Sequence, residues 1–265
     1  MIFYFSATGN TRWAAELLAN ATGERLVNMA DNDVPATWEL SENERIGFCF
    51  PVHGWRPPML VRRFISTLDI RNYNNNYVWA LCSAGDDIGQ TMEYLSHDLS
   101  LRGLNLDARF SIIMPESYVG LPFMDVDKPE KELAKKETSK KMLENYVQDI
   151  MSRERGITKT YKGHWPRINS NVLGAAFVKW LITDKPFWVD EEKCISCGTC
   201  ASVCPVADIK GGTGMKPEWT HNGKCLTCFN CYHHCPTHAI EYGKRTKNKG
   251  QYYFKYGKEY EEGNE

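Results

Sequence analysis

The chain has 265 residues, of which 42% are hydrophobic and 25% charged, and its formal net charge is −1. This composition is typical of one large or two modest globular domains, and the balanced charge gives no electrostatic reason to expect a nucleic acid partner. No apolar segment is long enough to span a bilayer, and the N-terminus lacks the basic and apolar regions of a signal peptide. We therefore expect a cytoplasmic protein without membrane insertion.

The first 153 residues alternate short apolar runs with amphipathic stretches. The expected strands are 2–5, 25–28, 46–52, 77–82 and 110–114, and the expected helices are 11–21, 58–68, 88–101 and 128–151. The helix at 88–101 shows the helical period, since Ile88, Met92, Leu95 and Leu99 recur on one face. Strands that alternate with helices predict parallel βαβ units, and hence a doubly wound α/β domain over residues 1–153.

The turn between the first strand and the first helix has an unusual composition. Its residues are Ser6, Ala7, Thr8, Gly9, Asn10 and Thr11. Such a turn offers backbone N–H groups and the positive end of the helix to an anion. Neither G-x-x-x-x-G-K-[ST] nor G-x-G-x-x-G is present, which argues against a triphosphate or a dinucleotide. We interpret the turn as a site for one terminal phosphate that approaches Gly9 closely; the alternative is that Thr8 or Asn10 merely caps the helix.

This loop, Ser6-Ala7-Thr8-Gly9-Asn10-Thr11, resembles the phosphate loop T/S-x-T-G-x-T of flavodoxins, which also directly follows the first strand. The order of strands and helices over residues 1–153 is similar to that family as well. The resemblance implies a doubly wound parallel sheet of five strands, in the order 2-1-3-4-5, that binds FMN at the carboxyl ends of its strands.

By the same resemblance, two further strand ends should contact the flavin ring. The implied contacts are Pro51, Val52, His53, Gly54 and Trp55 after the third strand, and Ser83, Ala84, Gly85 and Asp86 after the fourth. Trp55 is the expected stacking residue, because an indole covers the ring face and excludes water; a surface or core tryptophan is the alternative. Asp86 near the flavin would lower its potential, although Asp86 and Asp87 could instead cap the next helix. The loop 115–127 is expected to form a lid or a docking surface.

After the first domain, residues 154–187 are expected to form a connection with one helix at 172–182, whose apolar residues would pack between two domains. A cysteine-rich domain follows at 188–243. Residues 244–265 form a tail that mixes lysines with aromatic residues, and we expect it to pack back on the surface of the protein.

Eight of the ten cysteines fall between residues 194 and 235. They form two copies of C-x2-C-x2-C-x3-C-P offset by 31 residues: Cys194, Cys197, Cys200 and Cys204, then Cys225, Cys228, Cys231 and Cys235. This run ligates [4Fe–4S] clusters in bacterial ferredoxins, where the fourth cysteine binds the other cluster. A zinc site usually pairs two C-x2-C knuckles and needs no third cysteine, so we predict two [4Fe–4S] clusters.

Residues 188–243 thus resemble double-cluster bacterial ferredoxins. The resemblance implies that Cys194, Cys197, Cys200 and Cys235 bind one cluster and that Cys225, Cys228, Cys231 and Cys204 bind the other. The neighbouring histidines, His221, His233, His234 and His238, are then not needed as ligands, and we expect them to be exposed or packed. Cys49 and Cys82 stand alone in apolar runs; Cys82 is expected to be a small core residue.

The whole chain resembles flavodoxin–ferredoxin fusion proteins of anaerobic bacteria and archaea. The resemblance implies electron transfer between the clusters and FMN, with a redox protein or a small molecule as the partner. One alternative is a flavin-dependent reductase of a small organic acceptor, and a redox-sensing module is another. A carrier should leave the flavin edge open and stabilise the semiquinone, whereas a reductase should cover the flavin with a pocket, built from residues such as His53, Trp55, Tyr118 and Phe123. No motif names a catalytic reaction, so we prefer the carrier.

Overall fold

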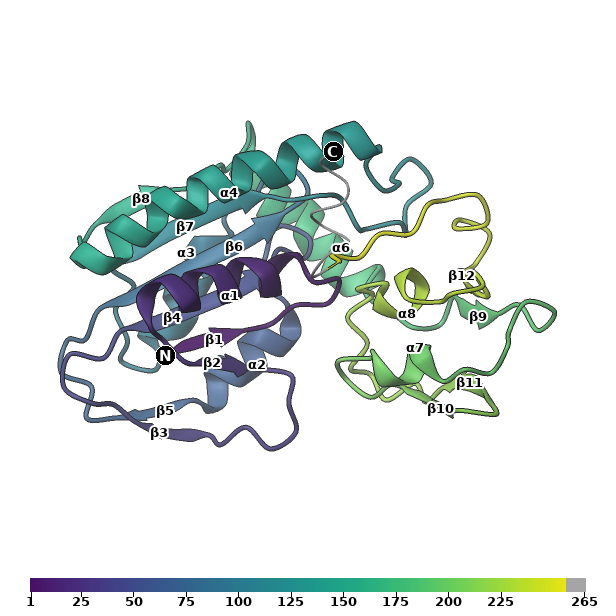
Figure 1. Cartoon of the computed structure of the whole chain (residues 1–265), viewed down its shortest axis with the longest axis horizontal. Helices are drawn as coiled ribbons and strands as arrows, with labels where there is room; N and C mark the ends of the chain where they lie inside the picture. Colours follow the sequence, from purple (N-terminus) through teal and green to yellow (C-terminus); the bar gives the residue numbers. More distant parts are fainter. Residues whose placement is uncertain (256–265) are drawn as a thin grey trace.

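The protein has two parts that differ in size and architecture. The computed structural model describes residues 1–255, and Figure 1 shows a large layered part around one sheet beside a smaller part rich in loops. The smaller part contains the segment from β9 to β12 and the eight clustered cysteines. Among the described residues, no helix is both long and apolar enough to cross a membrane.

The central sheet contains six parallel strands in the order β2-β1-β4-β6-β7-β8. The strands are β1 (Ile2–Tyr4), β2 (Leu26–Asn28), β4 (Ile46–Pro51), β6 (Val78–Ala84), β7 (Ala108–Ile113) and β8 (Ile157–Lys159). β4 and β6 lie in the middle with almost all of their residues buried, as expected for a parallel sheet that is covered on both faces. The first five strands have the order 2-1-3-4-5, which confirms the flavodoxin-like sheet.

The sixth strand, β8, is a departure from the five expected strands. It falls in the predicted connection and pairs with Ala108–Phe110 of β7. Three residues are too few to show a strand period, but their pairing satisfies backbone groups at the edge of β7 that would otherwise lack partners. A second difference is a small parallel pair outside the main sheet, β3 (Thr37–Glu39) with β5 (Asp69–Arg71), which the sequence pattern does not predict.

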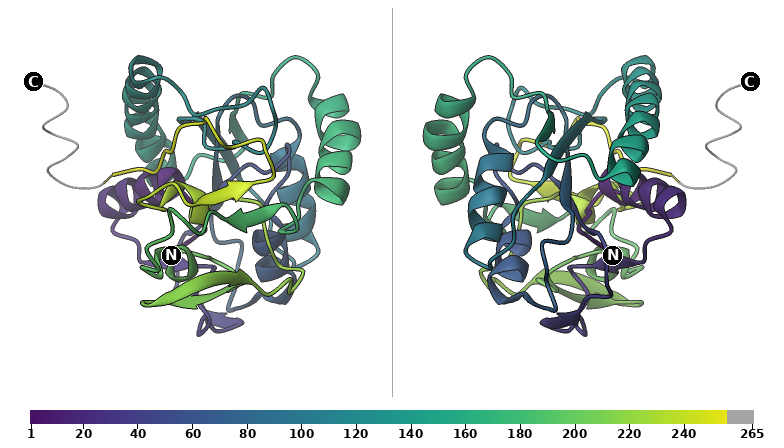
Figure 2. Two further views of the ribbon diagram at one scale, coloured as in Figure 1. Left: turned by 90° about the vertical axis from the view of Figure 1, so that its right-hand side faces the viewer. Right: turned by 90° about the vertical axis from the view of Figure 1, so that its left-hand side faces the viewer.

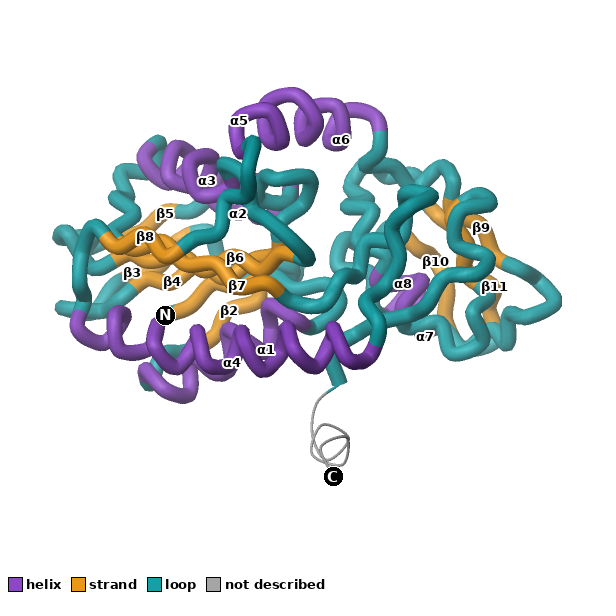
Figure 3. Tube along the Cα trace, turned by 90° about the horizontal axis from the view of Figure 1, so that it is seen from above, coloured by secondary structure: helices purple, strands orange, loops and turns teal. Residues whose placement is uncertain are grey.

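Four helices cover the two faces of the sheet. α1 (Asn10–Thr22) and α4 (Pro129–Ser152) pack together on one face, and α2 (Met59–Thr67) and α3 (Thr91–Ser100) pack together on the other. Figure 3 shows the two pairs on opposite sides of the strands. These bounds lie within a few residues of the predicted helices. Each face of the sheet has its own apolar core, so both helix pairs are held by buried side chains.

A continuous helical stretch leads from the large part to the small one. It consists of α5 (Pro166–Ile168), a single π-helical turn η1 (Asn169–Leu173) and α6 (Gly174–Trp180). It therefore begins before the helix predicted at 172–182. Figure 3 shows this stretch beyond α2 and α3, on the side of the molecule opposite α4. π-helical turns are rare and frequently lie at functional sites.

The smaller part contains the same supersecondary motif twice. Its strands pair antiparallel, β9 (Phe187–Val189) with β12 (Ile240–Tyr242) and β10 (Ile209–Gly212) with β11 (Met215–Trp219). Two one-turn helices, α7 (Thr199–Ser202) and α8 (Asn230–His233), occupy equivalent places in the two cysteine runs. The rings of Phe187, Phe229 and Tyr242 contact one another in its core. Figure 2 shows these strands in front of the parallel sheet, between α4 on one side and α6 on the other.

Candidate functional site

Three loops that follow β1, β4 and β6 carry the predicted flavin contacts. Because these parallel strands end at one edge of the sheet, the loops meet there and border a cavity of about 550 Å³. Thirteen of the fourteen predicted residues line this cavity: Ser6, Thr8, Asn10, Thr11, Pro51, Val52, His53, Gly54, Trp55, Ser83, Ala84, Gly85 and Asp86. Its volume is typical of a small-molecule site. We call this cavity the flavin pocket.

The loop from Ser6 to Thr11 leads into α1 without a side-chain cap. The N-cap position of α1 is Gly9, with φ 97°, and within the described chain no side chain caps this helix. The alternative that Thr8 or Asn10 caps α1 is therefore wrong. Since Asn10 and Thr11 belong to the first helical turn, their N–H groups have no acceptor within the helix and suit an anion. Thr11 Oγ1 lies 2.7 Å from Ser83 Oγ, which ties this loop to the one after β6.

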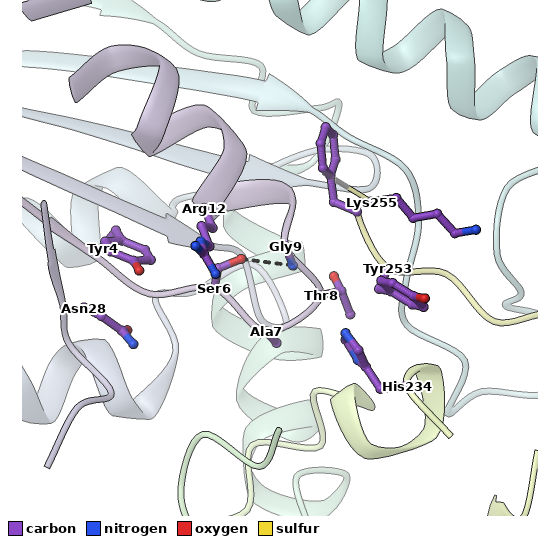
Figure 4. Close-up of a pocket in the computed structure, with 11 residues that line it drawn as sticks. Tyr4, Ser6, Ala7, Thr8, Gly9, Arg12, Asn28, His234, Tyr253 and Lys255 are labelled. Atoms are coloured by element: carbon purple, nitrogen blue, oxygen red, sulfur yellow. Dashed lines mark hydrogen bonds between the residues drawn. The ribbon is translucent and has the colours of Figure 1, made fainter. Parts of the chain in front are cut away.

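Two residues of this loop lie differently from the expectation. The side chain of Asn10 is engaged by other segments: its Nδ2 donates to Pro115 O at 3.1 Å and its Oδ1 accepts from Tyr252 OH at 2.5 Å. Gly9 instead lines a second cavity of about 510 Å³, together with Arg12 and Tyr253 (Figure 4), and this cavity shares Ser6, Ala7 and Thr8 with the flavin pocket. The Asn10 amide therefore holds the loop to the loop after β7 and to Tyr252.

Trp55 lies in a tight turn after β4. His53 and Arg56 exchange backbone hydrogen bonds at 3.0 and 3.3 Å, and Trp55 between them has a left-handed φ of 58°. The Trp55 side chain is hydrogen-bonded to Asp87, whose carboxyl pKa is raised by burial. Asp87 also accepts from Gly89 N–H at 3.1 Å, so it shapes the turn before α3. Burial lowers the pKa of His53 to about 4, which leaves this pocket side chain neutral at pH 7.

One wall of the flavin pocket comes from the helical connection, which the sequence pattern does not single out for a site, and from the loop after β7, in which Tyr118 and Phe123 are named as candidate pocket residues. The lining residues are Leu173, Ala176, Phe177, Trp180 and Leu181 from the helical connection, and Leu121, Phe123 and Met124 from the loop after β7. Arg56 fixes the connection to the Trp55 turn, because its guanidinium donates to Ser170 O at 3.0 and 2.7 Å. A Cβ on Gly174 would lie 2.3 Å from Gly54 O, so the two backbones are in direct contact. The connection therefore lines one side of the cavity.

The eight clustered cysteines form two separate sets of four. One small cavity is lined by Cys194, Cys197, Cys200 and Cys235, and another by Cys204, Cys225, Cys228 and Cys231. Each set takes its fourth cysteine from the other run, as in double-cluster ferredoxins. None of the eight forms a disulfide. Burial raises the pKa of Cys225 and of Cys228 to about 12, so a metal has to displace their protons before they bind it as thiolates.

Backbone N–H groups are directed at the fourth cysteine of each run. Asp208 N donates to Cys204 Sγ at 3.3 Å, and Ala239 N donates to Cys235 Sγ at 3.2 Å, from equivalent positions of the repeat. Hydrogen bonds of this kind stabilise thiolate charge and help to set the potential of a cluster. No histidine of the described chain lines either cysteine cavity; His221, for example, pairs with Asp184 at 3.0 Å.

The two cysteine sets differ in their position relative to the flavin pocket. Leu226 and Cys228 line both the flavin pocket and the cavity of the second set. The first set faces outward: Cys197 is exposed, and Ile195 and Met215 at its rim are 63% and 59% exposed. We call the set with Cys228 the inner set and the set with Cys197 the outer set.

Known proteins are similar to separate parts of this chain. Residues 187–236 match the family model of the 4Fe-4S dicluster domain, while no curated protein matches the chain. Among solved structures, a flavodoxin from Streptococcus pneumoniae is similar at 14% identity and TM-score 0.36. The match covers 57% of this chain and 97% of the flavodoxin chain. A protein described as a flavoprotein from Bacteroides uniformis is similar at 20% identity and TM-score 0.35. The match covers 43% of this chain and 88% of the Bacteroides chain.

The family match and the two sets of four cysteines define an iron–sulfur protein of the electron-transfer type. Its N-terminal sheet has the flavodoxin strand order, and the loop after β1 carries the phosphate-loop sequence at the expected edge. The chain therefore has the organisation of a flavodoxin–ferredoxin fusion protein.

Proposed function

We propose that the protein transfers electrons between two [4Fe–4S] clusters and FMN. The observation that carries this proposal is the shared wall, since Leu226 and Cys228 border both the inner cysteine set and the flavin pocket. Clusters supply one-electron steps, and a flavin supplies one- or two-electron steps. Centres on the two sides of one wall are held at high effective concentration, so transfer between them does not require a diffusing partner.

The residues of the flavin pocket fit the parts of FMN. The loop from Ser6 to Thr11 offers hydroxyls and first-turn N–H groups to one phosphate, which favours the mononucleotide over a dinucleotide. Trp55 offers an apolar face to the ring, and residues 83–86 lie along the opposite part of the pocket rim. His53 is neutral at pH 7, so it adds no charge beside the ring.

The positions of the cysteine sets suggest the path of the electrons. The outer set lies where Cys197, Ile195 and Met215 are exposed, and a redox protein can approach it there. The inner set stands between the outer set and the flavin pocket. We therefore assign the order outer cluster, inner cluster, flavin, with a redox protein as the partner at the outer end.

A second function, reduction of a small organic acceptor by the flavin, is favoured by one observation. An open flavin edge is expected of a carrier and a pocket around the flavin of a reductase, and here Leu173, Phe177 and Trp180 of the connection form an apolar side of the pocket. A flavin within a pocket is difficult for a protein to reach and remains accessible to a small molecule. Rapid oxidation of the reduced protein by small acceptors, but not by redox proteins, would favour this function.

We also propose the organisation that the sequence predicts: a flavodoxin-like domain at 1–153, a helical connection at 154–187, a cluster domain at 188–243 and a tail at 244–265. A cytoplasmic location belongs to the same proposal, because disulfide-free cysteines persist in reducing compartments. Of the tail, residues 256–265 lie outside the part of the chain that the structure describes.

The proposal is tested by loading the full chain anaerobically with iron, sulfide and FMN and then reducing it rapidly with a one-electron donor. We expect eight irons and one FMN per chain, and reduction of the flavin after the clusters at a rate independent of protein concentration. The Cys228→Ser variant should lose the inner cluster and slow flavin reduction strongly, whereas Cys49→Ser should not. Absence of bound FMN, or a rate of flavin reduction proportional to protein concentration, would refute electron transfer within the chain.

A further inference from the structure

The C-terminal segment from Arg245 to Phe254 returns from the small part to the large part. Figure 1 shows it running from β12 towards the N-terminal end of α1. Its aromatic residues Tyr252 and Phe254 are 6% and 4% exposed, which is the burial of core residues and not of a surface tail. We call residues 245–254 the clamp, because it contacts two separate walls of the flavin pocket.

The first wall is the loop after β7, which carries the pocket residues Leu121, Phe123 and Met124. The Lys249 ammonium donates to Val119 O at 3.0 Å, to Met124 O at 2.6 Å and to Leu121 O. An ammonium has three N–H donors, and this loop supplies three carbonyl acceptors for them. Arg245 adds a bond to Gly120 O at 3.0 Å. The clamp thus fixes the backbone of a loop whose own side chains line the flavin pocket.

The second wall is the phosphate loop. Phe254 N–H donates to Thr8 O at 2.7 Å, and Tyr252 OH donates to Asn10 Oδ1 at 2.5 Å. The Phe254 ring stacks on Trp13 of α1 with 5.2 Å between centroids. A Cβ on Gly9 would lie 2.8 Å from Phe254 Cβ, so the clamp is in direct contact with the loop backbone. Figure 4 shows Thr8 and Gly9 beside Tyr253 of the clamp.

The clamp is also anchored to the small part, close to the outer cysteine set. Gln251 Nε2 donates to Tyr232 O at 2.5 Å and to Cys235 O at 2.8 Å. Tyr252 N–H donates to His233 Nδ1 at 3.1 Å, and His233 Nε2 lies 2.7 Å from Ser117 O in the loop after β7. The clamp therefore connects the cysteine repeat, the loop after β7 and the phosphate loop.

We infer that the clamp is a positioning element of the flavin site. Lys249 holds the wall formed by the loop after β7, and Tyr252 and Phe254 hold the phosphate loop, so that flavin affinity depends on the segment that follows the cluster domain. This inference rests on the proposed flavin site. Because the coupling is reciprocal, bound FMN also stabilises the clamp on the phosphate loop.

The test is a titration of the cluster-loaded full chain with FMN, followed by calorimetry, for two pairs of variants. Tyr252→Phe removes only the hydroxyl on Asn10, and Tyr161→Phe is its matched control, since Tyr161 is 52% exposed and lines neither of the two cavities at the phosphate loop. Lys249→Met removes the bonds to three carbonyls, and Lys247→Met makes the same change at an exposed position two residues earlier.

We expect Tyr252→Phe to weaken FMN binding roughly three- to tenfold and Lys249→Met at least about tenfold, in line with the loss of one neutral and several charged hydrogen bonds. The two controls should bind as the unchanged chain does. Amide exchange at Phe254 should slow when FMN is added, which a merely structural tail would not show.

The outcomes separate the clamp from the flavin site. If the unchanged chain does not bind FMN, both proposals are overturned. If it binds FMN and both clamp variants bind equally well, only the clamp inference is overturned. If Lys249→Met loses its cluster absorbance, Tyr252→Phe decides, because it removes a single oxygen and leaves the ring in place.

Discussion

The attachment of the helical connection to the flavin pocket depends on Arg56, and we predict that Arg56→Met loosens this attachment. The guanidinium donates twice to Ser170 O, at 3.0 and 2.7 Å, and lies 4.7 Å from the centroid of the Tyr94 ring. Hydrogen bonds from a charged donor contribute about 2 kcal/mol, and a cation–π contact at a partly exposed site about 1 kcal/mol. Loss of about 3 kcal/mol raises the population of the detached connection about a hundredfold.

Hydrogen exchange followed by mass spectrometry measures this opening directly. In Arg56→Met, the amides of η1 and α6 should exchange about a hundredfold faster, while those of β4 and β6 should keep their protection. Arg63→Met is the matched control, because Arg63 is exposed and lies on α2, away from the connection. If the amide exchange rates of the helical connection change less than about threefold in Arg56→Met, Arg56 is not the residue that anchors the connection.

Three further predictions use other parts of the site. Cys228→Ser should halve the iron content and leave the outer cluster, as seen by EPR; loss of all iron would contradict two independent sets. Gly54→Ala should detach the connection, because Gly54 has φ 56° and a Cβ there would lie 2.6 Å from the Phe177 ring; unchanged Trp fluorescence and exchange would contradict this. Burial lowers the pKa of His53 to about 4, so the unfolded chain binds this proton at a higher pH and stability falls as pH drops from about 6.5 to about 4. In His53→Gln, the melting temperature should fall less steeply over that range, and an equal slope would show that His53 does not contribute.

The layered fold and the loops of the flavin pocket can be predicted because they depend on local pattern. Central strands such as β4 and β6 are unbroken apolar runs, and the position of the loop from Ser6 to Thr11 after the first strand places it at the carboxyl edge. The resemblance of the two cysteine runs to double-cluster ferredoxins likewise implies which thiols share a cavity. β8 escapes prediction because its three residues carry too little pattern.

The side of the pocket formed by the connection cannot be predicted in this way, for a physical reason. An apolar helix face has the same period whether it packs on a protein core or covers a cofactor, so Phe177 and Trp180 look like packing residues in the sequence. The role of Lys249 depends on carbonyls 125 to 130 positions away. Only the folded chain brings them together, and one lysine in a lysine-rich tail gives no sign of it.

The contact between the clamp and the phosphate loop also has a consequence for biosynthesis. Asn10 and its partner Tyr252 are 242 positions apart, so the phosphate loop leaves the ribosome well before its partner in the clamp. The N-terminal sheet can fold while synthesis continues, since domains generally fold as units in order of emergence. Its phosphate loop, however, gains its contacts with Tyr252 and Phe254 only after the cysteine repeat has been made, so the clamp is added to a sheet that has already formed.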